Sequence, residues 1–233
     1  MLRLEARIPA DAHTLHGELI IPAGATGIVL FAHGSGSSRL SPRNLLVAEI
    51  IRATGIGTLL FDLLTPEEEA RDASTAELRF DIAFLAERLV AASDWTQDHA
   101  PDMRLGYFGA STGAAAALVA AAETGERVGA IVSRGGRPDL AREWLARVRA
   151  PTLLIVGSLD HDVIRLNQEA YQELECEKQF TMIPGASHLF EEPGTLDQVA
   201  RLAAEWFQRH LGKASAEALA DERRAHRLAH PPS

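Results

Sequence analysis

The sequence predicts an α/β protein built on a doubly wound, mostly parallel sheet of about eight strands, with an N-terminal antiparallel hairpin and helices on both faces. Short runs that are apolar at every position alternate with longer helical patterns from about residue 27 to residue 212. Such runs suit strands that are covered on both faces. Strands alternating with helices indicate βαβ units and therefore a parallel sheet. The runs occupy residues 28–32, 58–61, 105–108, 130–132 and 152–156, and residues 179–183 are expected to form the last strand.

The first two predicted strands have no helix between them. Residues 2–8 and 14–21 are separated by only five residues, which is too few for a helical crossover. We therefore expect an antiparallel hairpin at the edge of the sheet. The helices that follow begin at recognisable capping signals. These signals are Ser41 before Pro42, Ser74 with Glu77, and Thr195 with Gln198.

The composition is that of an ordinary soluble globular protein. The chain has 233 residues, of which 46% are hydrophobic and 24% charged, and its formal net charge is −9. No cluster of Lys and Arg rises above this acidic background, so we expect no nucleic-acid partner. The N-terminus lacks the apolar region of a signal peptide, and no apolar run approaches the roughly 20 residues of a membrane span. A cytoplasmic protein without a membrane partner is the default expectation.

A single domain over residues 1–212 contains all the motifs described below. The last stretch, residues 213–233, is rich in charge, has few large apolar residues and ends in Pro-Pro-Ser. We expect a mobile or loosely packed extension there, with a solvated helix or the arm of a homodimer as alternatives. Because Cys176 is the one cysteine, no internal disulfide can form.

A G-x-S-x-G pattern marks the candidate nucleophile. Gly109-Ala110-Ser111-Thr112-Gly113 follows the run 105–108 and precedes an alanine-rich helical pattern. A strand–turn–helix context of this kind holds the serine on a sharp turn, where glycines leave room for neighbouring backbone. The first N–H group of the helix, that of Thr112, can then bind an oxyanion. The pattern predicts Ser111 as a nucleophile.

A serine nucleophile needs a base, and the base needs an orienting acid. His188 lies between the last predicted strand and the last predicted helix, which is the place of the base when the chain order is Ser, Asp, His. Asp160 and Asp162 both follow the run 152–156 and compete for the role of acid. We prefer Asp160 because it lies nearer the strand end, and we expect Asp162 to cap the helix that begins at Val163.

The loop after the run 28–32 predicts the rest of the oxyanion hole. It reads His33-Gly34-Ser35-Gly36-Ser37-Ser38-Arg39, and its glycines allow backbone to approach a substrate. We assign the second oxyanion-binding N–H to Ser35, with Gly36 as the alternative, and expect His33 to brace the loop. Nucleotide binding is the rival interpretation. G-x-G-x-x-G would need glycine where Arg39 stands, and G-K-[ST] is absent.

Together these motifs resemble the dienelactone hydrolase-like branch of the α/β-hydrolases. The turn around Ser111, the His33 loop, Asp160 and Pro-Gly-Ala-Ser-His188 carry the resemblance, which covers about residues 14 to 212. It implies the α/β-hydrolase fold and a Ser-His-Asp triad that cleaves esters through an acyl-enzyme without cofactor or metal. Dienelactone hydrolases proper use a cysteine nucleophile, and Ser111 here favours ordinary ester hydrolysis. A non-catalytic ligand- or partner-binding module, and a peptidase or acyltransferase with the same triad, are the alternatives.

Arginines near predicted strand ends indicate where an acidic substrate could bind. Arg39 lies in the oxyanion loop and Arg134 follows the run 130–132, at the edge where open parallel sheets bind ligands. With Gly36 they form the candidate substrate-binding set, suited to small, acidic or aryl esters or lactones. The short segment 134–150 leaves no room for a large lid. The alternative is that the arginines brace loops, with Arg134 bonded to Glu191, Glu192 or Asp62.

Overall fold

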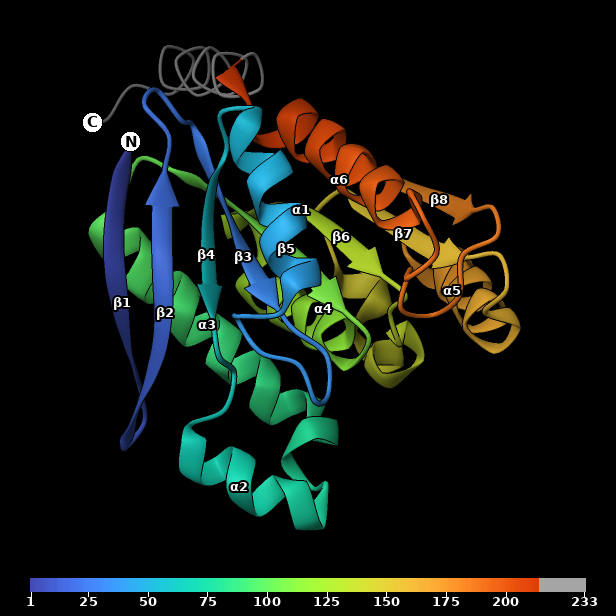
Figure 1. Ribbon diagram of the computed structural model, residues 1–233, viewed down its shortest axis with the longest axis horizontal. Helices are drawn as coiled ribbons and strands as arrows, with labels where there is room; N and C mark the ends of the chain where they lie inside the picture. The colour runs from blue at the N-terminus through green and yellow to red at the C-terminus, as the bar shows by residue number, and fades with distance from the viewer. Residues whose placement is uncertain (214–233) are drawn as a thin grey trace, which may run out of the picture.

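A computed structural model describes residues 1–213 and confirms the predicted architecture, one twisted sheet with helices on both faces (Figure 1). The described strands are β1 (Leu2–Ala10), β2 (His13–Ile21), β3 (Gly27–Ala32), β4 (Gly57–Phe61), β5 (Arg104–Ala110), β6 (Val128–Arg134), β7 (Thr152–Gly157) and β8 (Lys178–Ile183). Their order across the sheet is β1-β2-β4-β3-β5-β6-β7-β8. β1 and β2 form the expected antiparallel hairpin, β2 pairs antiparallel with β4, and all other neighbours are parallel.

The helices divide between the two faces of the sheet. Their bounds are α1 (Pro42–Ala53), α2 (Pro66–Thr75), α3 (Ile82–His99), α4 (Thr112–Thr124), α5 (His161–Glu173) and α6 (Thr195–Leu211). Short 3-10 segments are η1 (Leu78–Phe80), η2 (Gly125–Arg127) and η3 (Pro138–Arg147). α3 and α4 share one apolar core with the sheet, and α1 and α6 share the other (Figure 1). Within residues 1–213, none of the helices combines the length and the apolar character needed to cross a membrane.

The central strands alternate their side chains between these two cores. Along β6, Ile131 packs in the core under α3 and α4, whereas Ala130 and Val132 pack in the core under α1 and α6. A side-chain period of two along a strand requires this alternation. Arg134, two residues beyond Val132, therefore points toward the α1–α6 layer.

One predicted helix start is wrong, and the true start lies upstream. Ser74 belongs to the last turn of α2 and Glu77 follows that helix, so they cap nothing. The capping box is at Thr65 and Glu68, where the Glu68 N–H donates to the Thr65 hydroxyl (3.2 Å) and the Thr65 N–H donates to the Glu68 carboxylate (2.8 Å). The next helix, α3, begins at Ile82, and the side chain of its N-cap residue Asp81 accepts the N–H of Phe84.

Two further capping assignments are wrong, although both helices exist. α6 begins at Thr195, but Gly194 is its N-cap and the Thr195 hydroxyl donates to the Glu192 carbonyl (2.7 Å). Because Thr195 is the first residue of the helix and not its N-cap, no capping box forms with Gln198. α5 begins at His161 with Asp160 as its N-cap residue, so Asp162 lies inside the first turn and does not cap the helix.

α2 and η1 form an insertion beyond the carboxyl ends of β3 and β4, at the bottom of Figure 1. A buried ion pair attaches the insertion to α3, with Glu68 2.9 Å from Arg88. A second ion pair joins α2 to η1 within the insertion, with Asp72 2.6 Å from Arg79. The insertion is a small wall beside the sheet edge and not a large lid. The predicted extension 213–233 lies, except for its first residue, outside the described residues.

Candidate active site

The turn between β5 and α4 holds Ser111 in a strained conformation. Its φ is 51° and its ψ −121°, a region that costs a residue other than glycine about 1–3 kcal/mol. Glycines beside it allow the close packing that keeps the turn sharp. A Cβ on Gly109 would lie 2.4 Å from Ala114 Cα, and a Cβ on Gly113 would lie 2.1 Å from Ala32 O. This is the strand–turn–helix geometry that the G-x-S-x-G pattern predicts.

His188 is bonded to Asp160. The distance from His188 Nδ1 to Asp160 Oδ2 is 2.6 Å, and the Asp160 side chain is 14% exposed. A short, charge-assisted bond of this kind fixes the orientation of the ring. Asp160 is available for it because its side chain makes no capping bond to α5, whereas Asp162 is exposed in the first turn of that helix. The preference for Asp160 over Asp162 thus has a geometric basis.

The end of β6 brings the His188 loop near Ser111. The Ser111 N–H donates to the Arg134 carbonyl (3.3 Å), which extends the β5–β6 pairing by one residue. The next residue, Gly135, lies against the histidine, because a Cβ there would be 3.3 Å from His188 O and 3.5 Å from His188 Nδ1. Within residues 1–213 the His188 side chain bonds to Asp160 and not to Ser111. The hydrogen bond between the histidine and the serine of a triad is frequently long before a substrate binds.

The oxyanion loop meets the same turn. A Cβ on Gly34 would lie 3.0 Å from Ser111 Cβ, so the loop backbone passes directly beside the nucleophile. The hydroxyls of Ser35 and Thr112 are 3.1 Å apart and link the two residues whose N–H groups are the predicted oxyanion donors. As the first residue of α4, Thr112 has an N–H without an intrahelical acceptor. The sequence analysis missed this hydroxyl pair, because the two side chains lie on segments 77 residues apart.

His33 braces the oxyanion loop, as its position predicts. The Leu63 N–H donates to Nε2 (3.1 Å), so the ring proton lies on Nδ1, which is 3.1 Å from the Gly34 carbonyl. Burial lowers the pKa of His33 and favours this neutral ring. The carbonyl and N–H of one trans peptide point in opposite directions. Holding the Gly34 carbonyl therefore turns the Ser35 N–H away from His33.

Solved structures of known proteins place this geometry in a family. A dienelactone hydrolase from Anabaena variabilis is 57% identical and has a TM-score of 0.88, over 90% of this chain and 98% of that chain. The chain belongs to the dienelactone hydrolase branch of the α/β-hydrolases. Est1E from Butyrivibrio proteoclasticus (14% identical, TM-score 0.76, over 90% of this chain and 99% of that chain) shares the fold. So does a serine hydrolase without a lid from Xanthomonas campestris (20% identical, TM-score 0.72, over 90% and 95%). No protein-family model matches.

Curated relatives carry a different name. A protein from each of two Mycobacterium tuberculosis strains, called "Putative phosphoribosyl transferase", is 54% identical to this chain over 209 residues. The match covers 89% of this chain but 46% of each relative, so the chain spans about half the length of these proteins. More than half of each relative therefore lies outside the match.

In this member of the hydrolase family, a cavity opens beside the oxyanion loop and next to α2. It is narrow, with a cavity volume of about 40 Å³, and it opens to solvent. Leu63, Leu64 and Leu85 form the apolar part of its wall, and Ser35 and Thr112 line it from the oxyanion side. Concave, partly apolar spaces next to convergent polar groups are typical ligand sites. The cavity is the candidate pocket for one side of a substrate.

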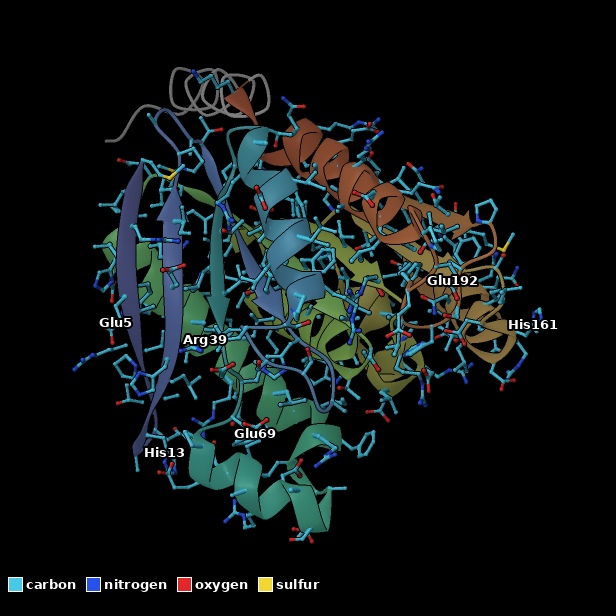
Figure 2. The ribbon with its side chains drawn as sticks, viewed as in Figure 1. Glu5, His13, Arg39, Glu69, His161 and Glu192 are labelled. Atoms are coloured by element: carbon cyan, nitrogen blue, oxygen red, sulfur yellow. The ribbon has the colours of Figure 1, made fainter. Side chains whose placement is uncertain are left out.

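Arg39 is bonded to a neighbouring loop. Its backbone N–H donates to Asp62 Oδ1 (2.7 Å), and its side-chain Nη1 lies 3.4 Å from Asp62 Oδ2. Figure 2 labels Arg39 in the loop between β3 and α1. The other two carboxylates considered as partners of Arg134 are also engaged. Glu191 is 3.3 Å from Arg43, and Glu192 accepts a backbone N–H of its own loop (3.0 Å).

Arg134 differs from Arg39 in having no such partner. It is 8% exposed, and its Nη1 is buried without a hydrogen-bond acceptor. Burial, followed by the positive charge of Arg43, lowers the pKa of Arg134 to about 10. Within residues 1–213 no carboxylate lies at ion-pair distance from it. The structure thus separates the two arginines that the sequence analysis grouped together, and it does not show the ion-paired brace considered for Arg134.

Proposed function

We propose that this protein hydrolyses carboxylic esters through an acyl-enzyme on Ser111. The bond of 2.6 Å between His188 Nδ1 and Asp160 carries the proposal. With its proton held on Nδ1, the imidazole keeps Nε2 free to accept the proton of a serine hydroxyl. The strained turn at Ser111 and the family of the chain support the same assignment.

The mechanism follows from the placement of these groups. Ser111 Oγ attacks the ester carbonyl carbon while His188 Nε2 takes the hydroxyl proton, and the Asp160 carboxylate stabilises the imidazolium. The carbonyl π pair moves onto oxygen and forms the tetrahedral oxyanion. When that intermediate collapses, the C–O bond to the alcohol breaks and His188 protonates the leaving oxygen. Water then attacks the acyl-enzyme with His188 again as base, which releases the acid and regenerates Ser111.

The N–H groups of Thr112 and Ser35 are the proposed oxyanion donors. Loss of one donor of this kind costs about 2.7–4 kcal/mol of transition-state stabilisation in other hydrolases. The N–H of Thr112 also lies at the positive end of α4, which favours negative charge. The bonds that hold the two loops together, His33 to Gly34 and Ser35 to Thr112, keep both donors in place before substrate arrives.

Small esters are the proposed substrates, with acidic or aryl esters and lactones among them. The narrow cavity of about 40 Å³ favours a small acyl or alcohol group, and within residues 1–213 no large lid covers it. Serine in place of the cysteine of dienelactone hydrolases proper favours esters over dienelactones. The panel that ranks these substrates consists of p-nitrophenyl and aryl esters of graded length and charge, together with one unsaturated lactone.

Phosphoribosyl transfer is the second candidate function, because the curated relatives carry that name. We propose that the transfer activity belongs to the part of those proteins outside the match. In this chain the Gly-rich loop passes directly beside Ser111, because a Cβ placed on Gly34 would lie 3.0 Å from Ser111 Cβ. That position suits an oxyanion hole better than a phosphate-binding loop. Release of pyrophosphate from phosphoribosyl pyrophosphate by this chain would contradict that division.

A fluorophosphonate probe tests the hydrolase directly. The wild-type protein should be labelled at Ser111 and should hydrolyse short p-nitrophenyl esters. Ser111→Ala should lose both properties and keep its melting temperature, because the turn tolerates a smaller side chain. Ser74→Ala is the matched control, since it removes an exposed serine hydroxyl of α2 that bonds to the Arg71 carbonyl and should keep both properties. A non-catalytic binding module would be labelled in neither protein, and hydrolysis retained by purified Ser111→Ala would falsify the assignment.

A further inference from the structure

The buried guanidinium of Arg134 is a charged group that the proposed mechanism leaves unused. Arg134 ends β6, and its carbonyl accepts the N–H of Ser111, so its backbone is bonded to the nucleophile. Its side chain points to the α1–α6 layer, as that of Val132 does. It is 8% exposed, and Nη1 is buried without an acceptor. A buried charge without a counter-ion strongly destabilises a fold, so this arrangement points to a ligand.

Arg43 places a second guanidinium in the same part of the site. It is 3.3 Å from Glu191, three residues after His188, and Gly135, the neighbour of Arg134, lies against His188. The positive charge of Arg43 also contributes, after burial, to the lowered pKa of Arg134. The Nε atom of Arg43 is also buried without a hydrogen-bond acceptor, while its Nη1 is 3.3 Å from Glu191. Two neighbouring guanidinium groups, one on β6 and one on α1, thus each present a buried donor that no described residue satisfies.

The first turn of α1 adds further donors to the same region. Arg43 is its second residue, the Ser41 side chain makes no capping bond, and no acidic residue lies in the turn. The N–H groups of an uncapped first turn carry partial positive charge and bind anions. Arg43 and Arg134 together with Glu191 give a local formal charge of +1, in a protein whose net charge is −9.

We propose that Arg134, Arg43 and the first turn of α1 form a subsite for an oxyanion group, a carboxylate or a phosphoryl, carried by the ligand of this active site. Planar guanidinium groups bind both anions through paired N–H donors. Glu191 is exposed, so its carboxylate can be solvated by water when the ligand anion replaces it as the partner of Arg43. Where the ligand is the ester itself, the inference rests on the proposed function.

The subsite assigns the two ends of a substrate to different places. The cavity next to α2 has Leu63, Leu64 and Leu85 in its wall and is not lined by Arg134 or Arg43. It takes the uncharged group of the ester. The anionic group lies on the β6 side of Ser111. Arg39 takes no part, because its guanidinium is already paired with the Asp62 carboxylate at 3.4 Å.

Anion binding is measured first, without turnover. Inorganic phosphate and acetate are titrated separately into full-length Ser111→Ala by calorimetry and thermal unfolding, in a buffer free of other oxyanions. At least one should bind at millimolar concentrations and raise the Tm. Stronger binding of phosphate identifies a phosphoryl ligand, and stronger binding of acetate a carboxylate. Arg134→Gln and Arg43→Gln, each added to Ser111→Ala, should lose the effect. Arg165→Gln is the matched control, because it removes an exposed arginine of α5.

A pair of esters that differ only in one anionic group then measures recognition. Arg134→Gln should raise KM for the acidic ester about ten- to hundredfold, as loss of charge-assisted hydrogen bonds does, and leave KM for the neutral ester unchanged. Arg134→Lys should recover part of the loss. The preferred anion should compete with the acidic ester alone.

Folding and function are kept apart by one more variant. Arg134→Met should melt no lower than wild type in oxyanion-free buffer, because an unpaired buried charge is replaced by an apolar side chain of similar length. Failure of phosphate and acetate to bind, or binding unchanged in Arg134→Gln, overturns the subsite. The subsite is also overturned if Arg134→Gln loses activity toward the acidic and the neutral ester equally and Arg134→Met has a lower Tm than wild type. Anion binding without any ester hydrolysis would instead overturn the proposed function and leave the subsite standing.

Discussion

Replacement of Asp160 by asparagine tests the triad most sharply, because a matched control lies two residues away. Asp160 accepts the Nδ1 proton of His188 at 2.6 Å and is 14% exposed, so little water is available to substitute for it. An asparagine amide can donate to Nδ1 and so favours the tautomer with the proton on Nε2, which cannot accept from Ser111. Loss of the orienting carboxylate lowers kcat by roughly 10³–10⁴-fold in other triads, which corresponds to about 4–5.5 kcal/mol.

The assay is kcat on a short p-nitrophenyl ester, with melting temperature measured on the same preparations. Asp160→Asn should lose activity and keep its fold, since the side chain has no capping bond to α5 to lose. Asp162→Asn should keep kcat and lose at most about 1 kcal/mol of stability, because one exposed carboxylate leaves the first turn of the helix. A larger kcat effect at Asp162 than at Asp160 would refute the assignment of the acid, whatever the fold of either variant.

Three further expectations concern the residues that hold the site. Burial lowers the pKa of His33 below its ordinary 6.5, so the unfolded chain binds a proton that the native chain does not. Stability in urea should therefore fall as pH drops below 6.5, and His33→Gln should flatten that slope; an unchanged slope would contradict the buried neutral ring. Gly135 has a φ of 51°, and a Cβ placed on it would lie 3.3 Å from His188 O. Gly135→Ala should therefore lower kcat and reduce the free energy of unfolding in urea by about 1 kcal/mol or more. A wild-type kcat in this variant would show that the loop moves freely. Thr112→Val removes the hydroxyl bonded to Ser35 but keeps the backbone N–H, so kcat should fall about tenfold. Thr112→Ser should restore kcat. Equal kcat in the two variants would show that the hydroxyl pair does not contribute to catalysis.

The elements that the sequence predicts well are those that follow from burial. Runs such as 130–132 are apolar at every position because helices cover β6 on both faces, and the structure only lengthens this strand to Val128–Arg134. The errors concern caps, where several polar residues compete. Thr195 has the right type and spacing for a capping box, but Gly194 is the N-cap and Thr195 is already the first residue of α6. Which residue becomes the N-cap depends on the path of the preceding loop, and a spacing pattern does not contain that path.

Within the candidate site, the sequence predicts which loops meet because the carboxyl ends of parallel strands share one edge. It does not predict which polar atoms bond across them. The hydroxyl pair of Ser35 and Thr112 and the contact of Gly135 with His188 both depend on the exact height of each loop above the sheet. The arginines show the same limit. Arg39 and Arg134 both lie at strand ends in the sequence, and only the side-chain positions show that one is bonded to Asp62 and the other is not.

β6 links chemistry to recognition in this molecule. The carbonyl of its last residue, Arg134, accepts the N–H of Ser111, the proposed nucleophile, and the Arg134 side chain points to the α1–α6 layer as that of Val132 does. The residue after it, Gly135, lies against His188 without a side chain of its own. A ligand anion bound to the guanidinium would therefore act on a strand end that contacts both the nucleophile and the base. Because the side chain and the carbonyl belong to one rigid strand residue, Arg134→Gln should weaken anion binding while leaving the Ser111 backbone in place. Any change in the rate of fluorophosphonate labelling, which needs no anion subsite, would then show that the guanidinium also holds the strand end.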